Sequence, residues 1–423
     1  MMTSTTNLFT LGNDGNVAVY PTSEEEIVRL VKEANEQGRK IAIAGMETKK
    51  GFGGLESSYD VLLSLRNYEG IVEYSPGDMT LTVKAGTRFK HLQDELAAHR
   101  QMITLDPAWP EQATIGGIVA ANESGPKRLG YGSSRDVVIG MRVVYPDGKV
   151  IRTGGKVVKN VAGYDMNKLF IGSMGTLGVI LEITFKLRPL PEYESVVLLA
   201  FPGDSPDRVR AFGLEVLDSM LEPVALELMN PSLAERLTGQ SCYTLAIGFE
   251  DVESSVRAQE DWIERLRPSN TQLSILTLHE AKAFWNKWSS LPPNGLAVPN
   301  GAETEASLKI GVKNFDVLPM IETSQTIADQ SGLELLAHGG LGHGLCQVDL
   351  RGESEAVVAA IRDIRTAAEK LGGYAIVKHL PLHLRQTVGV WGNNPAHFFL
   401  LEGIKKKVDP NGILNHKRFV GGI

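Results

Sequence analysis

The chain has 423 residues, of which 43% are hydrophobic and 22% are charged, and its formal net charge is −7. This length predicts two or three domains with sizeable cores, and the lack of a basic excess argues against nucleic acid as a partner. The two cysteines exclude a disulfide framework, and they are too few for an iron–sulfur cluster ligated by this chain alone.

The same composition favours a reducing compartment and a protein without a membrane span. Two thiols are typical of cytosolic chains, and no stretch reaches the about 18 apolar residues that a span needs. The first residues lack the basic, apolar and small-residue order of a signal peptide. We therefore expect a cytoplasmic protein.

The N-terminal part begins with a helix and continues in short strands. The stretch PTSEEEIVRLVKEANEQG predicts a helix with Thr22 or Ser23 as its N-cap and Gly38 at its end. Turn residues and alternating apolar residues then predict four strands and a second helix, over residues 40–44, 61–65, 70–75, 80–86 and 87–100. From Asp136 a two-stranded hairpin turns at residues 146–148, and a further strand covers 178–191.

Pro189 and Pro191 mark a boundary in the pattern. Beyond them a strand, a helix and a strand follow one another over residues 196–230, and this β-α-β order recurs before residue 385. The pattern predicts an α+β second domain built on an antiparallel sheet. Trp262, Trp285 and Trp288 lie in helix-like stretches of this domain, where we expect core positions rather than an interface.

Glycines gather in three segments of the N-terminal part. In IAIAGMETKKGFGG a strand runs into a loop whose backbone N–H groups can converge on an anion such as a pyrophosphate. In DPAWPEQATIGGIVAANESG the small residues let the main chain approach a flat ligand, and in KNVAGYDMNKLFIGSMGTLGVILEITF glycines precede a buried strand. Each segment, taken singly, is equally explained by a turn or by tight packing.

Together these segments resemble a known family. ATIGG, GYGSSRDVVIGMRVVYPDGKVI, VVKNVAGYD and LFIGSMGTLGVILEITFKLRPLP are similar to the FAD-binding domain of the vanillyl-alcohol oxidase and p-cresol methylhydroxylase (PCMH) superfamily. Within it, GPKRLGYGSSRD and GGKVVKNVAGYD look most like the FAD-binding E subunits of bacterial glycolate oxidases, relatives of the catalytic D subunits and of D-lactate dehydrogenases. The tail DPNGILNHKRF resembles the DPxGxxNPGRF ending of that family.

The resemblance implies an α+β fold in three parts. Residues 1–190 would form a PCMH-type two-subdomain FAD-binding domain, and residues 191–385 an α+β cap domain with an antiparallel sheet. Residues 386–423 would form a C-terminal segment that returns to the FAD domain.

The resemblance also implies which residues bind FAD. Those expected around the pyrophosphate are Gly45, Met46, Glu47, Thr48 and Lys49. Those expected along the isoalloxazine ring are Asp106, Pro107, Thr114, Ile115, Gly116 and Gly117. The main chain of Val179 would meet the adenine end.

Two positions depart from the family pattern. Relatives carry consecutive glycines where this chain has Met46 and Glu47, and a carboxylate beside a pyrophosphate disfavours binding through like-charge repulsion unless Lys49 and Lys50 offset it. Gly130 stands where relatives often have arginine, and Arg128 is the residue that can substitute.

The catalytic relatives hold a metal ion with a His-x-Gly-Asp-Gly-Asn-x-His segment, and AHGGLGHGLC lines up with it. His338 matches the first ligand, but Leu345 stands at the second and Leu341 replaces the aspartate. At the third ligand, in a Glu-His pair, this chain has Lys378 before His379. We therefore predict no metal site and no catalytic residue.

His343 is the residue that can replace the missing second ligand. Two imidazoles without a carboxylate would hold a metal only loosely. The alternative, which we favour, is that His338 and His343 are packed or hydrogen-bonded in the second domain.

These observations predict an FAD-binding, electron-transferring subunit of a glycolate or related D-2-hydroxyacid dehydrogenase complex. Its partners would be a homologous catalytic flavoprotein subunit and an iron–sulfur subunit. One alternative is a self-sufficient FAD-dependent 2-hydroxyacid dehydrogenase that uses His379, or His338 with His343, as a metal-free base. Another is a structural subunit that has lost FAD, which the Met46-Glu47 pair favours.

Overall fold

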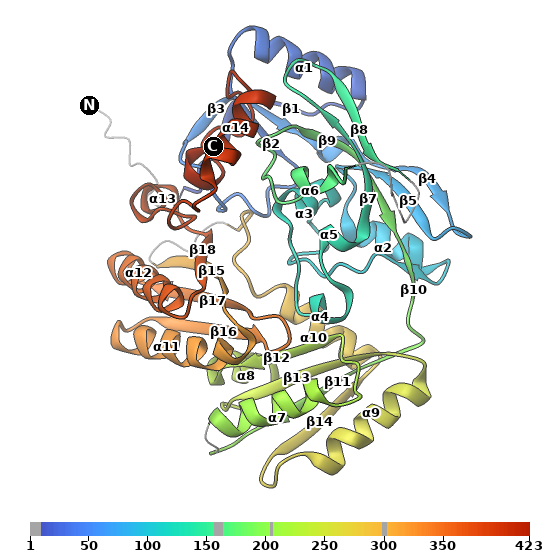
Figure 1. Cartoon of the computed structure of the whole chain (residues 1–423), viewed down its shortest axis with the longest axis vertical. Helices are drawn as coiled ribbons and strands as arrows, with labels where there is room; N and C mark the ends of the chain where they lie inside the picture. The colour runs from blue at the N-terminus through green and yellow to red at the C-terminus, as the bar shows by residue number, and fades with distance from the viewer. Residues whose placement is uncertain (1–9, 156–163, 204–205, 298–302) are drawn as a thin grey trace.

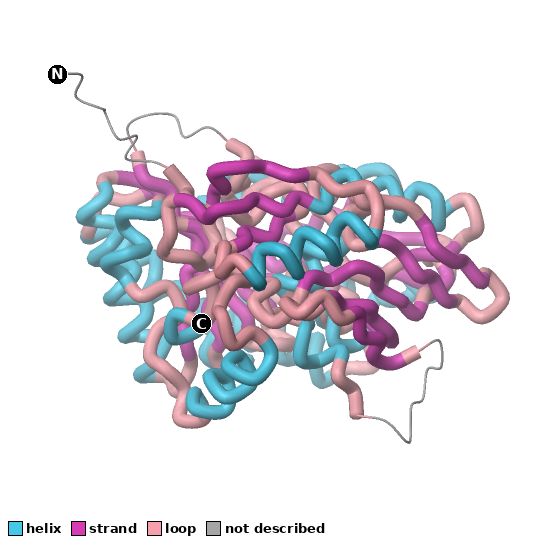
Figure 2. Tube along the Cα trace, turned by 90° about the horizontal axis from the view of Figure 1, so that it is seen from above, coloured by secondary structure: helices cyan, strands magenta, loops and turns pink. Residues whose placement is uncertain are grey.

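The computed structural model describes residues 10–155, 164–203, 206–297 and 303–423 (Figures 1 and 2). Most of the VVKNVAGYD motif therefore lies outside the described residues. Two large hydrophobic cores organise the chain, one in its N-terminal part and one around a second, larger sheet. Among the described helices, none is long and apolar enough to cross a membrane.

The first helix forms as its sequence predicts. Helix α1 (Glu24–Glu36) has Ser23 as its N-cap, and the Ser23 hydroxyl accepts a hydrogen bond from the Glu26 amide. The Glu26 carboxylate in turn accepts from the Thr22 and Ser23 amides, which completes a capping box. The apolar stripe of this helix is buried against the first core.

Two sheets build the N-terminal part. A parallel sheet has the order β1 (Asp14–Val19), β3 (Ser58–Ser64), β2 (Ile41–Ala44). An antiparallel sheet has the order β4 (Ile71–Ser75), β5 (Thr80–Lys84), β9 (Val179–Lys186), β7 (Val138–Val144), β8 (Val150–Gly154). The strands and the hairpin predicted for this part are confirmed.

Short elements connect these two sheets. The α-helices are α2 (Phe89–Ala97), α3 (Ile115–Ala121), α4 (Arg128–Tyr131), α5 (Ser134–Val137) and α6 (Asn167–Phe170). A 3-10 turn covers Leu65–Asn67, and β6 (Gln101–Met102) pairs with β10 (Arg188–Pro189).

The second part is built on one eight-stranded antiparallel sheet. Its order is β14 (Gln272–Thr277), β11 (Tyr193–Ala200), β13 (Thr244–Asp251), β12 (Ala225–Met229), β16 (Glu334–Gly340), β17 (Leu345–Gly352), β15 (Thr304–Gly311), β18 (Tyr374–His379). The predicted α+β class and the antiparallel sheet are confirmed.

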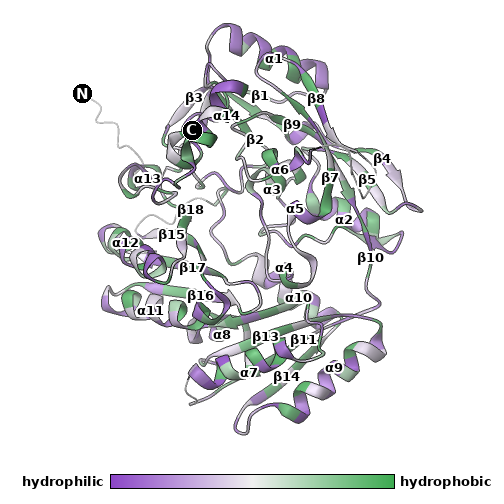
Figure 3. Ribbon diagram, in the orientation of Figure 1, coloured by the Kyte–Doolittle hydropathy of each residue, from purple (hydrophilic) through white to green (hydrophobic). Residues whose placement is uncertain are grey.

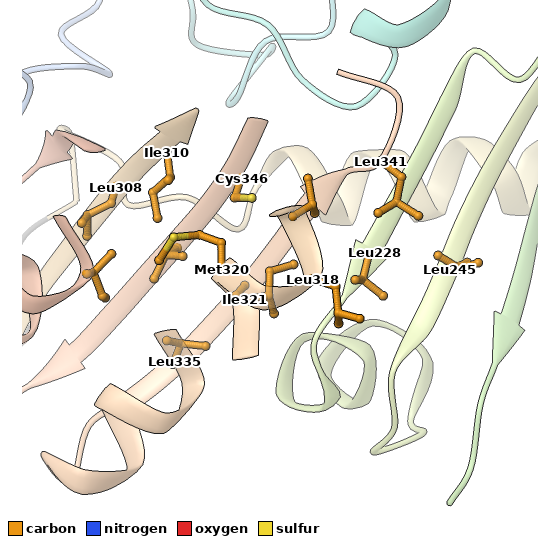
Figure 4. Close-up of a cluster of buried hydrophobic side chains, with 14 of the residues drawn as sticks. Leu228, Leu245, Leu308, Ile310, Leu318, Met320, Ile321, Leu335, Leu341 and Cys346 are labelled. Carbon is orange, nitrogen blue, oxygen red and sulfur yellow. The ribbon is translucent and has the colours of Figure 1, made fainter. Parts of the chain in front are cut away.

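Helices cover the two faces of this sheet unequally. One face carries the second core, under α7 (Pro206–Asp218), α9 (Glu253–Leu266), α11 (Val317–Gln330) and α12 (Ser354–Lys370), and Figure 4 shows part of it. On the other face α8 (Pro231–Thr238) and α10 (His279–Ser289) form a smaller apolar cluster. Figure 3 shows hydrophilic and hydrophobic residues mixed along α9 and α11, as expected of helices with one face on a sheet.

The three tryptophans belong to these packed layers. Trp288 is buried in the cluster of α8 and α10, where Trp285 packs beside it, and Trp262 packs against the second core. The prediction of a core position is confirmed for Trp288, whereas Trp262 and Trp285 are partly buried at the edges of the two clusters.

Because side chains alternate along a strand, polar residues lie on the part of the second sheet face that α8 and α10 do not cover. In β15 the side chains of Leu308 and Ile310 enter the core, so Lys309 between them points the other way. His338 in β16 and Lys378 in β18 lie on this same face, and they line a cleft shared with the N-terminal part.

The C-terminal segment returns to the first core, as Figure 1 shows for its red helices beside the blue strands. It contains α13 (Leu382–Val388), α14 (Phe398–Val408) and a final 3-10 turn at Val420–Gly422. The Ile41 amide donates to the Ile413 carbonyl at 2.7 Å, and the Asn415 amide donates to the Ile41 carbonyl at 2.9 Å. The division at residues 190 and 385 stays a prediction, and Val388 and Val390 still pack in the second core.

Candidate cofactor-binding site

A cleft of about 630 Å³ opens where β2 ends, and we call it the loop cleft. Its walls are residues 43–50, Ala113, Thr114, Gly117, Ile118, Ala120, Ala121 and Met174, with Asn13 and Arg418 from the two ends of the described chain. Of the residues predicted to bind FAD, the cleft thus brings together Gly45, Met46, Glu47, Thr48, Lys49, Thr114 and Gly117.

The backbone of this loop is shaped as a glycine-rich anion loop would be. Glu47 adopts a left-handed conformation, with φ of 60°, which glycine occupies without steric cost. At Gly45 a Cβ atom would lie 2.0 Å from the Thr114 hydroxyl oxygen, so only glycine fits. Among the described residues, the amide N–H groups of 46–49 have no hydrogen-bond acceptor. These donors are available to a phosphate.

Two cationic side chains next to the Glu47 carboxylate neutralise its charge. Arg66 Nη2 lies 3.1 Å from one carboxylate oxygen and Lys50 Nζ lies 3.4 Å from the other. Arg66 is held in place because its Nε donates to the Ser64 hydroxyl at 3.1 Å. The expected help from Lys50 is confirmed, whereas Arg66 was not foreseen. These ion pairs weaken the repulsion that the Met46-Glu47 departure predicted.

Lys49 has no such bond to Glu47 within the described chain. Its side chain makes no hydrogen bond or ion pair with any described residue, and burial lowers the pKa of its ammonium, against the opposing effect of Glu123. Arg66 and Lys50 each approach one carboxylate oxygen of Glu47, and the expectation that Lys49 also offsets this charge stays a prediction. The Lys49 cation is instead available to an anionic ligand in the cleft.

Five other predicted residues do not line either cleft. Asp106 acts on the site indirectly. Its carboxylate accepts hydrogen bonds from the Gly125 amide at 2.8 Å and from the Lys127 amide at 2.6 Å. Burial raises the pKa of Asp106 to about 6 against these two bonds. Pro107, Ile115, Gly116 and Val179 are packed within the first part of the chain.

A second cleft of about 900 Å³ adjoins the first, and we call it the sheet cleft. It shares Ala121 and Met174 with the loop cleft. One wall is the polar face of β15–β18, and the other is the segment after α3, from Asn122 to Arg128. Phe52 and Trp391, whose ring centroids are 5.1 Å apart, close one side.

The sheet cleft places a lysine where catalytic relatives are expected to carry a metal-binding glutamate. Lys378 Nζ lies 2.9 Å from a carboxylate oxygen of Glu123, and both side chains are largely buried. Burial by itself would raise the pKa of Glu123, but Lys378 and Lys49 outweigh it and hold this pKa at about 2. Glu123 is therefore ionised at neutral pH, and the Lys378 ammonium paired with it would repel a divalent cation.

The two histidines of the aligned segment share one buried carboxylate. His338 Nδ1 lies 2.7 Å from Glu227 Oε2, and His343 Nε2 lies 3.4 Å from Glu227 Oε1. The bonds from both rings outweigh burial, which would raise the pKa of Glu227, so this pKa is lowered. The expectation that these histidines are hydrogen-bonded in the second domain is confirmed. Across the described ranges, no cluster of three or more His, Cys, Asp or Glu side chains is placed to hold a metal ion.

The remaining positions of the aligned motif do not supply a ligand or a base. Leu341 packs in the second core (Figure 4), and Leu345 lines the sheet cleft with an apolar side chain. His379 is buried against Gly51, outside both clefts, and burial together with Arg385 lowers its pKa to about 4. Its imidazole is neutral at pH 7 and has no access to a ligand in either cleft.

Several residues of the site were missed by sequence reasoning. Arg418 lines the loop cleft, where its Nη2 donates to the Lys49 carbonyl at 3.2 Å and its Nε to the Phe52 carbonyl at 3.3 Å. The tail motif DPNGILNHKRF contains this arginine and was the available signal. Glu123 and Glu227 carried no signal, because each meets its partner more than 100 positions away in the chain.

Comparisons with known proteins identify the family. A family model described as "FAD binding domain" matches residues 16–154. D-2-hydroxyglutarate dehydrogenase of Xanthomonas citri pv. viticola is 33% identical over 424 residues, which cover 93% of this chain and 87% of that protein. The chain belongs to this family of FAD-dependent oxidoreductases. The predicted cofactor, FAD, is confirmed at the level of the family.

The subunit-level resemblance of this FAD-dependent oxidoreductase extends over less of the chain. Glycolate oxidase subunit GlcE of Escherichia coli is 37% identical over 168 residues, which cover 40% of this chain and 47% of that protein. Glycolate oxidase subunit GlcD of Bacillus subtilis is 26% identical over 418 residues, which cover 95% and 88%. Relatedness to both kinds of glycolate oxidase subunit is therefore established, and similarity over the full length is to the GlcD kind.

The fold prediction is confirmed by solved structures. p-Cresol methylhydroxylase with substrate bound superposes with a TM-score of 0.73 over 97% of this chain and 90% of that one, at 18% sequence identity. This identity supports the fold alone. The oxidoreductase thus has the PCMH-type fold that its glycine segments predicted.

Proposed function

We propose that this chain is the FAD-binding, electron-transferring subunit of a D-2-hydroxyacid dehydrogenase complex of the glycolate oxidase type. The observation that carries this proposal is the Lys378–Glu123 ion pair, which stands where a catalytic relative would carry a metal-binding carboxylate. Leu345 at the second ligand position supports it further.

The loop cleft is the proposed FAD site. The free amides of residues 46–49 and the Lys49 ammonium would bind the pyrophosphate, and the small side chains of Ala120 and Ala121 would border the flat ring. FAD supplies two-electron acceptance and release, and the protein's part is to hold it, exclude water and fix its surroundings. Asp106 contributes indirectly, by fixing the turn at residues 125–127.

The proposed partners follow from the chemistry that this chain lacks. A catalytic flavoprotein subunit would oxidise the hydroxy acid, and an iron–sulfur subunit would take the electrons, since the two cysteines here are single, free thiols. The free thiols also support a cytoplasmic location. GlcD and GlcE among the relatives support a complex with more than one flavoprotein subunit.

Turnover by the isolated chain tests the proposal. The purified holoprotein is given glycolate, D-lactate or D-2-hydroxyglutarate with an artificial dye acceptor. We expect no dye reduction and no bleaching of the flavin by these acids, although dithionite bleaches it. Reduction of the flavin by any of the three acids in the absence of a partner would refute the electron-carrier role.

The second candidate is a self-sufficient 2-hydroxyacid dehydrogenase. Similarity to named dehydrogenases over more than nine-tenths of the chain favours it, as does the buried Glu227 hydrogen-bonded to His338, an arrangement able to orient an imidazole base. If the isolated chain turns over, His338→Gln should abolish the activity and His379→Gln should not. The structural-subunit alternative rested on Glu47, whose charge the ion pairs with Arg66 and Lys50 offset.

A further inference from the structure

The open edge of strand β14 has no role in the proposed function. β14 is the first strand of the eight-stranded sheet and, in the part of the chain that the structure describes, it pairs with β11 alone, over six residues without a register shift. It lies at the end of the molecule opposite α1 (Figure 1), and none of its residues lines the loop cleft or the sheet cleft. A partner at this edge would therefore occupy neither cleft.

Half of the backbone groups of β14 face outward from the sheet. The Leu278 amide, just beyond the strand, donates to the Glu194 carbonyl at 2.9 Å, which makes these two residues a hydrogen-bonded pair. Hydrogen-bonded and non-bonded pairs alternate along an antiparallel ladder, so the N–H and C=O groups of Leu273, Ile275 and Thr277 point away from β11. Each of these three residues thus offers a donor and an acceptor to another strand.

The other long strands at sheet edges are protected, and β14 is not. Soluble proteins protect an open edge with charged side chains, prolines or bulges, because unpaired backbone groups otherwise bind another strand. β14, with the sequence QLSILT, has none of the three. Among the described edge strands of four or more residues, each of the others carries a charge or is covered by the chain, through Asp14 in β1, Glu73 in β4, Arg152 in β8, Lys378 in β18, and Ile413 and Asn415 beside β2.

Apolar surface accompanies the open edge. Leu266 and Leu278, the leucines that flank β14 in sequence, are 46% and 49% exposed. On the sheet face that carries α8 and α10, a groove of about 1090 Å³ is lined by Gln272, Ser274 and Leu276 of β14, together with side chains of β11, α8 and α10. A further strand beside β14 would extend the floor of this groove and remove apolar surface from water, which favours association.

We propose that β14 pairs with β14 of a second copy of this chain around a two-fold axis, so that two eight-stranded sheets form one continuous sheet. A two-fold axis runs the two strands antiparallel and brings each side chain close to its own copy, so a charged strand would repel itself. The uncharged β14 meets this condition, whereas β1, β4, β8 and β18 do not. This inference goes beyond electron transfer and does not depend on it.

The mass of the purified holoprotein in solution tests the proposal. Sedimentation equilibrium over a range of protein concentrations should give twice the mass of one chain at the high end and a dissociation constant for the dimer. Hydrogen exchange reports the contact itself. The amides of Leu273, Ile275 and Thr277 should exchange about tenfold or more slowly in the dimer than in the dilute monomer, because they become hydrogen-bonded.

Opposite charges at one position identify the pairing of the two strands. Ser274 lies within β14 and is exposed, so the fold should tolerate a charged residue there. Ser274→Lys and Ser274→Glu should each raise the dissociation constant of the dimer about tenfold or more, because like charges meet across the two-fold axis. An equimolar mixture of the two variants should form a dimer again. Ser57→Lys, at an exposed serine just before β3, is the matched control and should associate like the wild type.

A wild-type protein that is monomeric at every concentration would overturn the proposal. A dimer in which the three outward amides exchange as fast as in the monomer would do the same, and so would a mixture of the Lys and Glu variants that stays monomeric. Urea unfolding and FAD content of each variant should equal those of the wild type, which separates association from folding. No substrate is present in these measurements, so the electron-transfer role keeps its own test.

Discussion

Glu47 combines a left-handed backbone with a partly buried carboxylate in the loop that lines the proposed cofactor site. Its side chain is 15% exposed, and it is tolerated there because Arg66 and Lys50 occupy its two oxygens. The carboxylate of the residue that departs from the expected glycine pattern is thus compensated by an arginine about twenty positions away in sequence.

Removing Arg66 should therefore weaken cofactor binding. Arg66→Ala leaves an incompletely paired carboxylate in the cleft wall, and like charges a few ångströms apart near a protein surface repel by about 1–3 kcal/mol, so the Kd for FAD should rise about tenfold. Fluorescence titration of the apoprotein with FAD measures this. Glu47→Gln in the Arg66→Ala background should restore affinity, and Arg265→Ala on the exposed side of α9 should leave it unchanged. Failure of the Glu47→Gln rescue would show that Arg66 acts by another route.

The Lys378–Glu123 pair should contribute to stability in a pH-dependent manner. The pKa of Glu123 in the folded protein, about 2, lies below the ordinary value of 4.5, so its stabilising contribution is full above pH 4.5 and is lost as the pH falls toward 2. Lys378→Met should lower the free energy of unfolding at pH 7 by about 3 kcal/mol, because it leaves a buried carboxylate without its hydrogen-bonded partner.

Urea unfolding at several pH values checks this expectation. The double variant Lys378→Met with Glu123→Gln should recover most of the loss at pH 7 and show a weaker dependence on pH between 4.5 and 2 than the wild type. Equal stability of Lys378→Met and the wild type at pH 7 would contradict the assignment.

At the scale of elements, the polar wall of the sheet cleft exists because strand order and strand alternation act together. The strands that carry Lys309, His338 and Lys378 are drawn from three separate stretches of sequence. Their alternation can be predicted locally, but which strands become neighbours is a property of the whole sheet, against whose opposite face α11 and α12 pack.

Asn230 connects helix α8 to this sheet through side-chain hydrogen bonds. Its side-chain oxygen accepts from the Leu233 amide at the start of α8 and from the Ala337 amide of β16, at 3.1 and 3.0 Å, and its amide nitrogen donates to Gln325 of α11. Asn230→Ala should lower the free energy of unfolding by about 2–3 kcal/mol, because it removes a cap and leaves a buried amide unpaired. Ser23→Ala, at the exposed cap of α1, should cost only about 1 kcal/mol. Denaturant unfolding of the two variants compares them, and equal losses would mean that burial of the Asn230 network adds nothing.

At the scale of the whole molecule, the loop that forms the cofactor cleft is closed by the last residues of the chain. Arg418 donates to two carbonyls of that loop, and Asn415 and Ile413 pair with β2 beside it. The geometry of the loop is therefore a property of both ends of the chain rather than of the glycine segment alone.

Arg418→Met should accordingly weaken FAD binding. We expect a rise of about tenfold in the Kd, since two charge-assisted hydrogen bonds that hold the loop are lost. Lys417→Met removes a neighbouring cation that is paired with Glu56 at the surface, and it should leave the Kd unchanged. Titration of both apoproteins with FAD measures the two Kd values. An equal rise in Kd for the two variants would indicate general destabilisation of the C-terminal tail.

Local patterns in the sequence determined much of this protein. The capping box of α1 and the alternation in β15 each follow from residues within a few positions of one another. The glycine segments, taken together, resembled those of the PCMH superfamily, and that resemblance implied the fold and FAD. Such segments are recognisable because a backbone that approaches a phosphate or a flat ring restricts side chains at fixed places.

Only the tertiary structure decided which charges meet. Arg66 with Glu47, Lys378 with Glu123, and the two histidines with Glu227 are pairs between separate elements. They balance the charge of the loop at Glu47, and they give Lys378, which stands where the resemblance implies a metal-binding carboxylate in catalytic relatives, a buried acidic partner. A pattern of residue types determines which side chains of a strand point to the core and which point away from it. The distance between two charges, however, depends on how whole elements pack. Electrostatic energy is set by that distance and by burial.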